Sequence, residues 1–184
     1  MNSSPIGYTT AMPTTIKPII ASQLLASLAM MNDCIQKCPA ELWNNPEKTV
    51  AKYPFWLVAY HTLCFVDLYL SPSETVYQPR TQPPLILHPR GWQEFDDEYP
   101  SRTFTQSELL AYIQICREKI ATVLGDGPDS ETETSLNGPS GFSRLTFTRT
   151  ELHLDNLRHL QHHPGQLTAF LRRGGVETSW VKAG

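Results

Sequence analysis

Three histidines have the residue type and spacing to bind one transition-metal ion. His159 and His163 are four positions apart, and His61 lies far upstream in an otherwise apolar stretch. On a helix, residues four apart share a face, with Cβ atoms roughly 5–6 Å apart, so two imidazoles can reach one ion. A third imidazole from another helix leaves a coordination position open for water or substrate, which is typical of catalytic metal sites.

Polar residues flank the histidine pair on the same predicted helix face. At about 100° per residue, one narrow stripe contains Leu152, Asn156, His159, His163, Gln166 and Phe170. The stripe is apolar at its ends and polar in its middle. Because a buried polar group must be hydrogen-bonded or bind something, Asn156 and Gln166 are predicted to orient the ligand rings or a bound water.

Each histidine also has a purely structural interpretation. Two histidines four apart on a helix often bind no metal, and a single histidine in an apolar helix is more often a hydrogen-bonded core residue. The combination favours a metal because both signals lie on faces predicted to be in the core. Of the other histidines, His162 is expected to face solvent or a neighbouring helix and His153 to lie at the surface. His88 belongs to a proline-rich connection.

Other chemistries find less support in the sequence. No glutamate accompanies the histidines as in metalloproteases, and no serine nucleophile elbow, glycine-rich phosphate loop or CxxC motif is present. Asp67 is either near the solvated end of its helix or an inward-facing acid, and the first interpretation is favoured because Asp67 is close to the C-terminal end of the helix. The four cysteines are expected to be reduced and buried, since free cysteine usually behaves as a small apolar residue. Cys34 and Cys38, four apart, are a weaker candidate for a metal pair.

The hydrophobic pattern predicts four helices that position these residues. The first and third show apolar residues at steps of three and four, and the second is apolar nearly all round and should be the most buried. Thr105 and Glu108 form a capping box at the start of the third helix. No strand pattern and no internal repeat is found. The fold class is therefore all-α, a four-helix bundle, with helices at about residues 18–38, 54–70, 105–124 and 148–173.

The connections predict one domain with one long loop. Residues 1–15 are expected to be a flexible tail, and residues 16–184 a single bundle domain. The connection 71–103, between the second and third helices, is rich in proline and aromatic residues. It is expected to pack on the bundle and to form a pocket wall through Trp92, Phe95 or Tyr99. Residues 126–141 are expected to be loop or partly disordered.

Composition excludes several classes of partner. The chain has 184 residues, 40% of them hydrophobic, with 15 basic and 18 acidic residues and a net charge of -3. No basic cluster stands out, so nucleic acid is not an expected partner. No export signal and no membrane span are expected, which favours a cytoplasmic protein.

At the histidine positions the chain resembles the DinB/YfiT-like superfamily. Members are four-helix bundles that hold a divalent metal through one histidine of the second helix and an HxxxH pair of the fourth, typically followed by Gly-Gln. His61, the pair His159 and His163, and Gly165-Gln166 match this pattern, and the resemblance covers about residues 18–173. One departure is Pro164, which removes a helix hydrogen bond to the carbonyl of Leu160 and is expected to kink the last helix beside the metal.

The resemblance implies a cytoplasmic metal-dependent enzyme with Zn or Ni bound by the three histidines. Activities of the superfamily include thiol-dependent transfer, such as bacillithiol or mycothiol S-transfer, and maleylpyruvate isomerisation. It therefore implies a hydrolase or thiol S-transferase acting on a small molecule, with a low-molecular-weight thiol as a further cofactor. A homodimer is the assembly that we consider, apart from the resemblance. The alternative is a non-catalytic bundle, with a structural metal or none, that acts as a dimeric interaction module.

Overall fold

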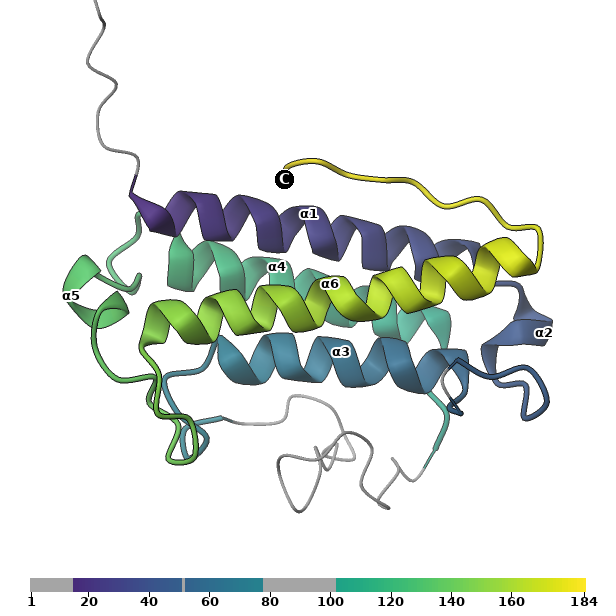
Figure 1. The fold of residues 1–184 in the computed structure, drawn as a ribbon, viewed down its shortest axis with the longest axis horizontal. Helices are drawn as coiled ribbons and strands as arrows, with labels where there is room; N and C mark the ends of the chain where they lie inside the picture. Colours follow the sequence, from purple (N-terminus) through teal and green to yellow (C-terminus); the bar gives the residue numbers. More distant parts are fainter. Residues whose placement is uncertain (1–14, 51, 78–101) are drawn as a thin grey trace, which may run out of the picture.

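The structure is a computed structural model that describes residues 15–50, 52–77 and 102–184. Four long helices form a bundle (Figure 1). They are α1 (Ile16–Lys37), α3 (Phe55–Tyr69), α4 (Gln106–Leu124) and α6 (Arg149–Arg173). Two short helices, α2 (Ala40–Trp43) and α5 (Glu133–Leu136), lie in the connections, and α5 falls where the sequence predicted only loop. Each long helix begins and ends within two residues of its predicted bounds, so the all-α prediction is confirmed.

Capping residues and prolines explain where the long helices begin. Both predicted contacts of the Thr105–Glu108 capping box are present at the start of α4. A second capping box, formed by Thr148 and Glu151, starts α6. Pro18 lies in the first turn of α1, where the missing N–H costs no helix hydrogen bond. Local sequence therefore sets these boundaries.

The helix α3 is the centre of the core. All fifteen of its residues are buried, which confirms the prediction from its apolar composition. It packs against both α4 and α6. The helix α1 completes the bundle by packing against the same two helices. By length and composition α1 could also cross a membrane, but half of its most apolar window is buried inside the bundle, as in a core helix.

The helix directions follow from contacts between neighbouring helices. Cys116 Sγ in α4 lies 3.7 Å from the carbonyl of Leu63 in α3, and Lys119 lies beside Asp67 one turn further along both helices. The helices α3 and α4 are therefore parallel. Contacts of Ser27 with Gln161 and of Cys34 with Thr168 likewise make α1 and α6 parallel.

This topology requires the long connection between α3 and α4. Because the two helices are parallel, the chain must return along the bundle, and the fifteen residues of α3 correspond to about 22 Å. A short turn cannot span that length, so a long crossover is needed. Residues 78–101 lie outside the described residues. His88 and the predicted pocket wall, with Trp92, Phe95 and Tyr99, are among these residues, so both predictions lie outside the described part of the chain.

Two polar residues predicted near solvent are fully buried. Asp67 is 0% exposed because its carboxylate is held by Lys119 and Tyr112 of α4. His153 is also 0% exposed, and its Nε2 donates to Glu131 of the connection before α5. Both predictions of surface positions are wrong. In each case a partner from another segment satisfies the polar group inside the protein.

Candidate metal centre

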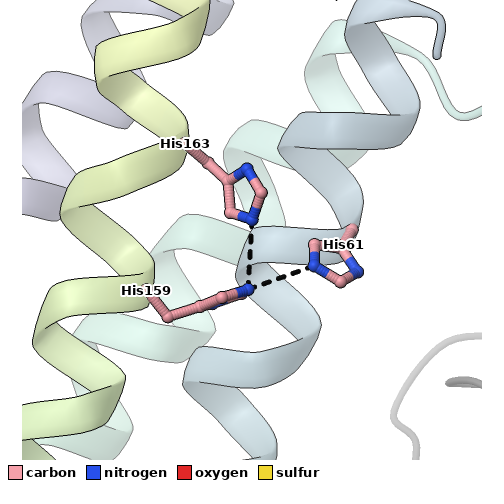
Figure 2. Close-up of side chains that lie close together, drawn as sticks. All are labelled: His61, His159 and His163. Atoms are coloured by element: carbon pink, nitrogen blue, oxygen red, sulfur yellow. Dashed lines mark hydrogen bonds between the residues drawn. The ribbon is translucent and has the colours of Figure 1, made fainter. Parts of the chain in front are cut away.

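His61, His159 and His163 converge between α3 and α6 (Figure 2). His159 and His163 project from successive turns of α6, and His61 meets them from α3. His159 Nε2 lies 3.1 Å from His61 Nε2 and 3.1 Å from His163 Nε2. One nitrogen from each ring lies within 4.8 Å of those of the other two. The structure thus brings together the three histidines that the sequence singled out.

Burial differs between the three rings. His61 is 4% exposed and His163 is 1% exposed, whereas His159 is partly exposed. The cluster therefore lies at the edge of the core, with His159 on its solvent side. His162, one position before His163, is exposed, which confirms the prediction that it faces solvent, and its ring packs edge-on against that of His163 with centroids 5.0 Å apart.

Gln166 fixes the orientation of the His163 ring. Its side-chain Oε1 lies 2.9 Å from His163 Nδ1, one turn along α6. An amide oxygen can only accept, so Nδ1 carries the proton and the lone pair of the neutral ring is on Nε2. That lone pair points toward the other two histidines.

Burial also keeps the His163 ring neutral. Loss of hydration lowers its pKa to about 4, although the hydrogen bond to Gln166 acts in the opposite direction. Near pH 7 the ring is therefore uncharged. A neutral imidazole with an available Nε2 lone pair is the form that binds a metal ion.

The arrangement of the nitrogens fits a divalent ion. A ring nitrogen carries either one proton or one lone pair, so His159 Nε2 cannot form a full hydrogen bond with both neighbours at once. A cation shared by the three lone pairs resolves this conflict. Ligand nitrogens about 2.0–2.1 Å from one tetrahedral zinc lie about 3.3–3.4 Å apart. Two of the three separations found here are close to that value, at 3.1 Å each, and the third is within 4.8 Å.

Comparison with known proteins assigns the chain to a family. A sequence model of the DinB family matches residues 20–184. The chain belongs to the DinB family. No curated protein and no solved structure gives a significant match. The family assignment, together with the buried histidine cluster, is compatible with a metal-binding enzyme.

In this DinB-family chain, Pro164 does not interrupt the last helix. The helix α6 runs from Arg149 to Arg173 with Pro164 inside it (Figure 1). Pro164 is buried and directly follows His163. The lost backbone hydrogen bond is therefore tolerated within a helix that packs against both α1 and α3, and the three histidines still converge.

Asn156 makes a different contact from the one expected. Its Nδ2 donates to the carbonyl of Val66 in α3 at 3.5 Å. Asn156 is 0% exposed, and among the described residues its Oδ1 has no hydrogen-bond partner. The contact joins α6 to α3 one helical turn from His159. A role of Asn156 in orienting the ligands stays a prediction.

Phe65 is a neighbour of the site that sequence reasoning did not single out. Its ring centroid lies 4.8 Å from that of His61 and 4.9 Å from that of His159. Phe65 follows His61 by four residues, so the same helical spacing that paired His159 with His163 would have placed it on the face of His61.

A groove of about 870 Å³ has His159 in its lining. It lies along α1 and α6 and is completed by the C-terminal segment, which runs back along α1 (Figure 1). Three hydrogen bonds hold that segment on α1: from Ser179 N to Asp33, from Gln23 to the carbonyl of Lys182, and from Gly184 N to the carbonyl of Ser22. The volume is in the range of small-molecule sites.

Proposed function

We propose that this DinB-family protein is a metal-dependent enzyme acting on a small molecule, with His61, His159 and His163 as the ligands of a divalent ion such as Zn or Ni. One observation carries the proposal. Nε2 of His159 lies 3.1 Å from Nε2 of each of the other two rings, so that one cation between them could be shared by all three imidazoles. Three imidazole ligands also leave a coordination position open.

The chain supplies the properties that such a site needs. A divalent ion bound there provides Lewis acidity and lowers the pKa of a coordinated water or thiol. His163 stays neutral because it is buried, and Gln166 holds its proton on Nδ1. Partly exposed His159 gives the site its contact with solvent. This arrangement suits a hydrolase or a thiol S-transferase, in which water or a low-molecular-weight thiol attacks an electrophile.

The groove beside His159 supports a small-molecule substrate. Its lining combines apolar side chains with charged ones, among them Trp180, Arg158 and Asp155. His159 is the residue that this groove shares with the histidine cluster. The predicted homodimer and the cytoplasmic location stay predictions.

Metal content of the purified protein tests the proposal. Wild type, His159→Ala and His162→Ala are compared by plasma mass spectrometry after reconstitution with Zn or Ni and removal of excess metal. We expect about one equivalent in the wild type, loss in His159→Ala, and retention in His162→Ala. The matched control is informative because His162 is a histidine of the same helix that is exposed.

Activity then separates an enzyme from a structural site. The loaded wild type is screened for hydrolysis and for thiol transfer to electrophilic small molecules, with His159→Ala as the inactive reference. In the metal assay, a wild type that binds no metal, or equal metal content in wild type, His159→Ala and His162→Ala, would contradict the assignment of ligands. A stoichiometric metal that only raises the melting temperature, with no turnover in either screen, would favour the non-catalytic interaction module.

A further inference from the structure

Phe65 contacts two of the three histidine rings from one position. Its ring is tilted by 54° to that of His61 and by 53° to that of His159, with centroids 4.8 Å and 4.9 Å apart. His61 belongs to α3 and His159 to α6. One side chain of α3 therefore packs on candidate ligands from both helices.

Other aromatic rings pack in a row with Phe65. Tyr69, one turn further along α3, packs edge-on against Phe65 with centroids 5.4 Å apart. Phe142, from the connection before α6, packs edge-on against Tyr69 at 5.6 Å. All three side chains are buried: Phe65 is 7% exposed, Tyr69 6% and Phe142 4%. Phe65 is therefore held by contact with Tyr69, which is itself packed against Phe142 in the core.

We propose that Phe65 is a positioning residue for the metal ligands, holding the rings of His61 and His159 in the orientation that directs both Nε2 atoms to one point. The inference rests on the proposed function, because it requires that the histidines bind a metal. It extends that function to a residue that cannot itself be a ligand.

The physical argument starts from the freedom of an imidazole ring. The torsion that turns a histidine ring has broad minima, so the orientation of a ring depends on what packs or hydrogen-bonds against it. Gln166 provides that constraint for His163. For the other two rings, Phe65 provides a common surface. It also excludes water from one side of the site, and the apolar surroundings of a metal contribute to its affinity.

A pair of identical substitutions tests the role of Phe65. Phe65→Leu removes the ring beside the histidines, and Phe142→Leu makes the same change two rings away. The zinc Kd is measured by competition with a chromophoric chelator, and the ligand field by the visible spectrum of the cobalt-substituted protein. Phe65→Leu should raise the Kd about tenfold or more, as changes around metal ligands typically do, and should alter the cobalt bands. Phe142→Leu should leave the Kd within about twofold of wild type.

Further variants separate positioning from general destabilisation. Phe65→Tyr keeps the ring and should restore the wild-type Kd and cobalt spectrum. If Phe65→Leu does not fold, Phe65→Ile is measured in its place. A wild-type Kd and spectrum in the leucine or isoleucine variant, or equal losses in Phe65→Leu and Phe142→Leu, would overturn the positioning role. A wild type that binds neither zinc nor cobalt would instead overturn the proposed function.

Discussion

Asp67 of α3 and Lys119 of α4 form an ion pair of 2.6 Å in which Asp67 is completely buried. Lys119 Nζ also donates to the carbonyl of Asp67 and to Ser71 Oγ, and the Tyr112 hydroxyl donates to the second carboxylate oxygen. The cluster joins two parallel helices that only a long crossover connects along the chain. It therefore fixes how far α3 and α4 are shifted along their axes.

Replacement of Asp67 is expected to be strongly destabilising. Asp67→Ala leaves the Lys119 ammonium in a mostly buried position without its carboxylate, and breaking a buried pair in this way costs about 3–5 kcal/mol. Urea denaturation of the wild type and of Asp67→Ala measures the loss in the free energy of unfolding. Asp155→Ala, which removes an exposed pair with Arg158, should change stability by less than about 1 kcal/mol. Equal effects of the two substitutions would contradict the structural role of the buried pair.

Gln166→Ala is expected to weaken metal binding without unfolding the protein. The substitution frees the His163 ring to turn and no longer fixes its proton on Nδ1, and loss of such a partner typically costs 10–100-fold in metal affinity. Chelator competition measures the Kd. Gln161→Ala is the matched control, because Gln161 belongs to the same helix but bonds to Ser27 of α1. An unchanged Kd for Gln166→Ala would show that Gln166 does not orient the ring.

The metal-free protein is expected to lose stability in mild acid. The folded His163 has a pKa of about 4, whereas the unfolded side chain titrates near 6.5. Between these values the unfolded state binds a proton that the folded state does not, so the free energy of unfolding falls as the pH falls from about 6.5 to about 4. The loss attributable to this group is about 3 kcal/mol.

Denaturation at a series of pH values, with a chelator present, measures this dependence. His163→Asn lacks the titrating ring and should show a correspondingly shallower loss across the same window. Identical pH profiles for wild type and His163→Asn would mean that His163 has an ordinary pKa in the folded protein.

Glu131 is expected to stabilise the end of the bundle where α6 begins. Its two carboxylate oxygens accept from Arg149 Nε at 2.7 Å and His153 Nε2 at 2.8 Å, and Arg149 is only 4% exposed. Glu131→Ala leaves a buried guanidinium without its counter-charge, so a loss of about 3–5 kcal/mol is expected. Thermal unfolding of Glu131→Ala beside Glu133→Ala, an exposed glutamate two positions away, measures it. A small effect of Glu131→Ala would mean that water satisfies Arg149.

Much of the candidate site was predictable because its pattern is local. The spacing of His159, His163 and Gln166 along one helix places them on one face whatever the rest of the chain does. The apolar surroundings of His61 likewise indicated a buried position. The same spacing rule would have placed Phe65 beside His61, but it could not show that the ring also reaches His159 on another helix.

The sequence by itself determined the positions of the four long helices and the faces they bury, because helical periodicity and capping depend on residues a few positions apart. The tertiary structure decided which polar residues are buried and which helices are neighbours. Asp67 meets Lys119 across 52 positions, His153 meets Glu131 across 22, and His61 meets His159 across 98. Such partners depend on the direction and packing of whole helices, so local pattern alone placed Asp67 and His153 at the surface and the folded bundle placed them inside.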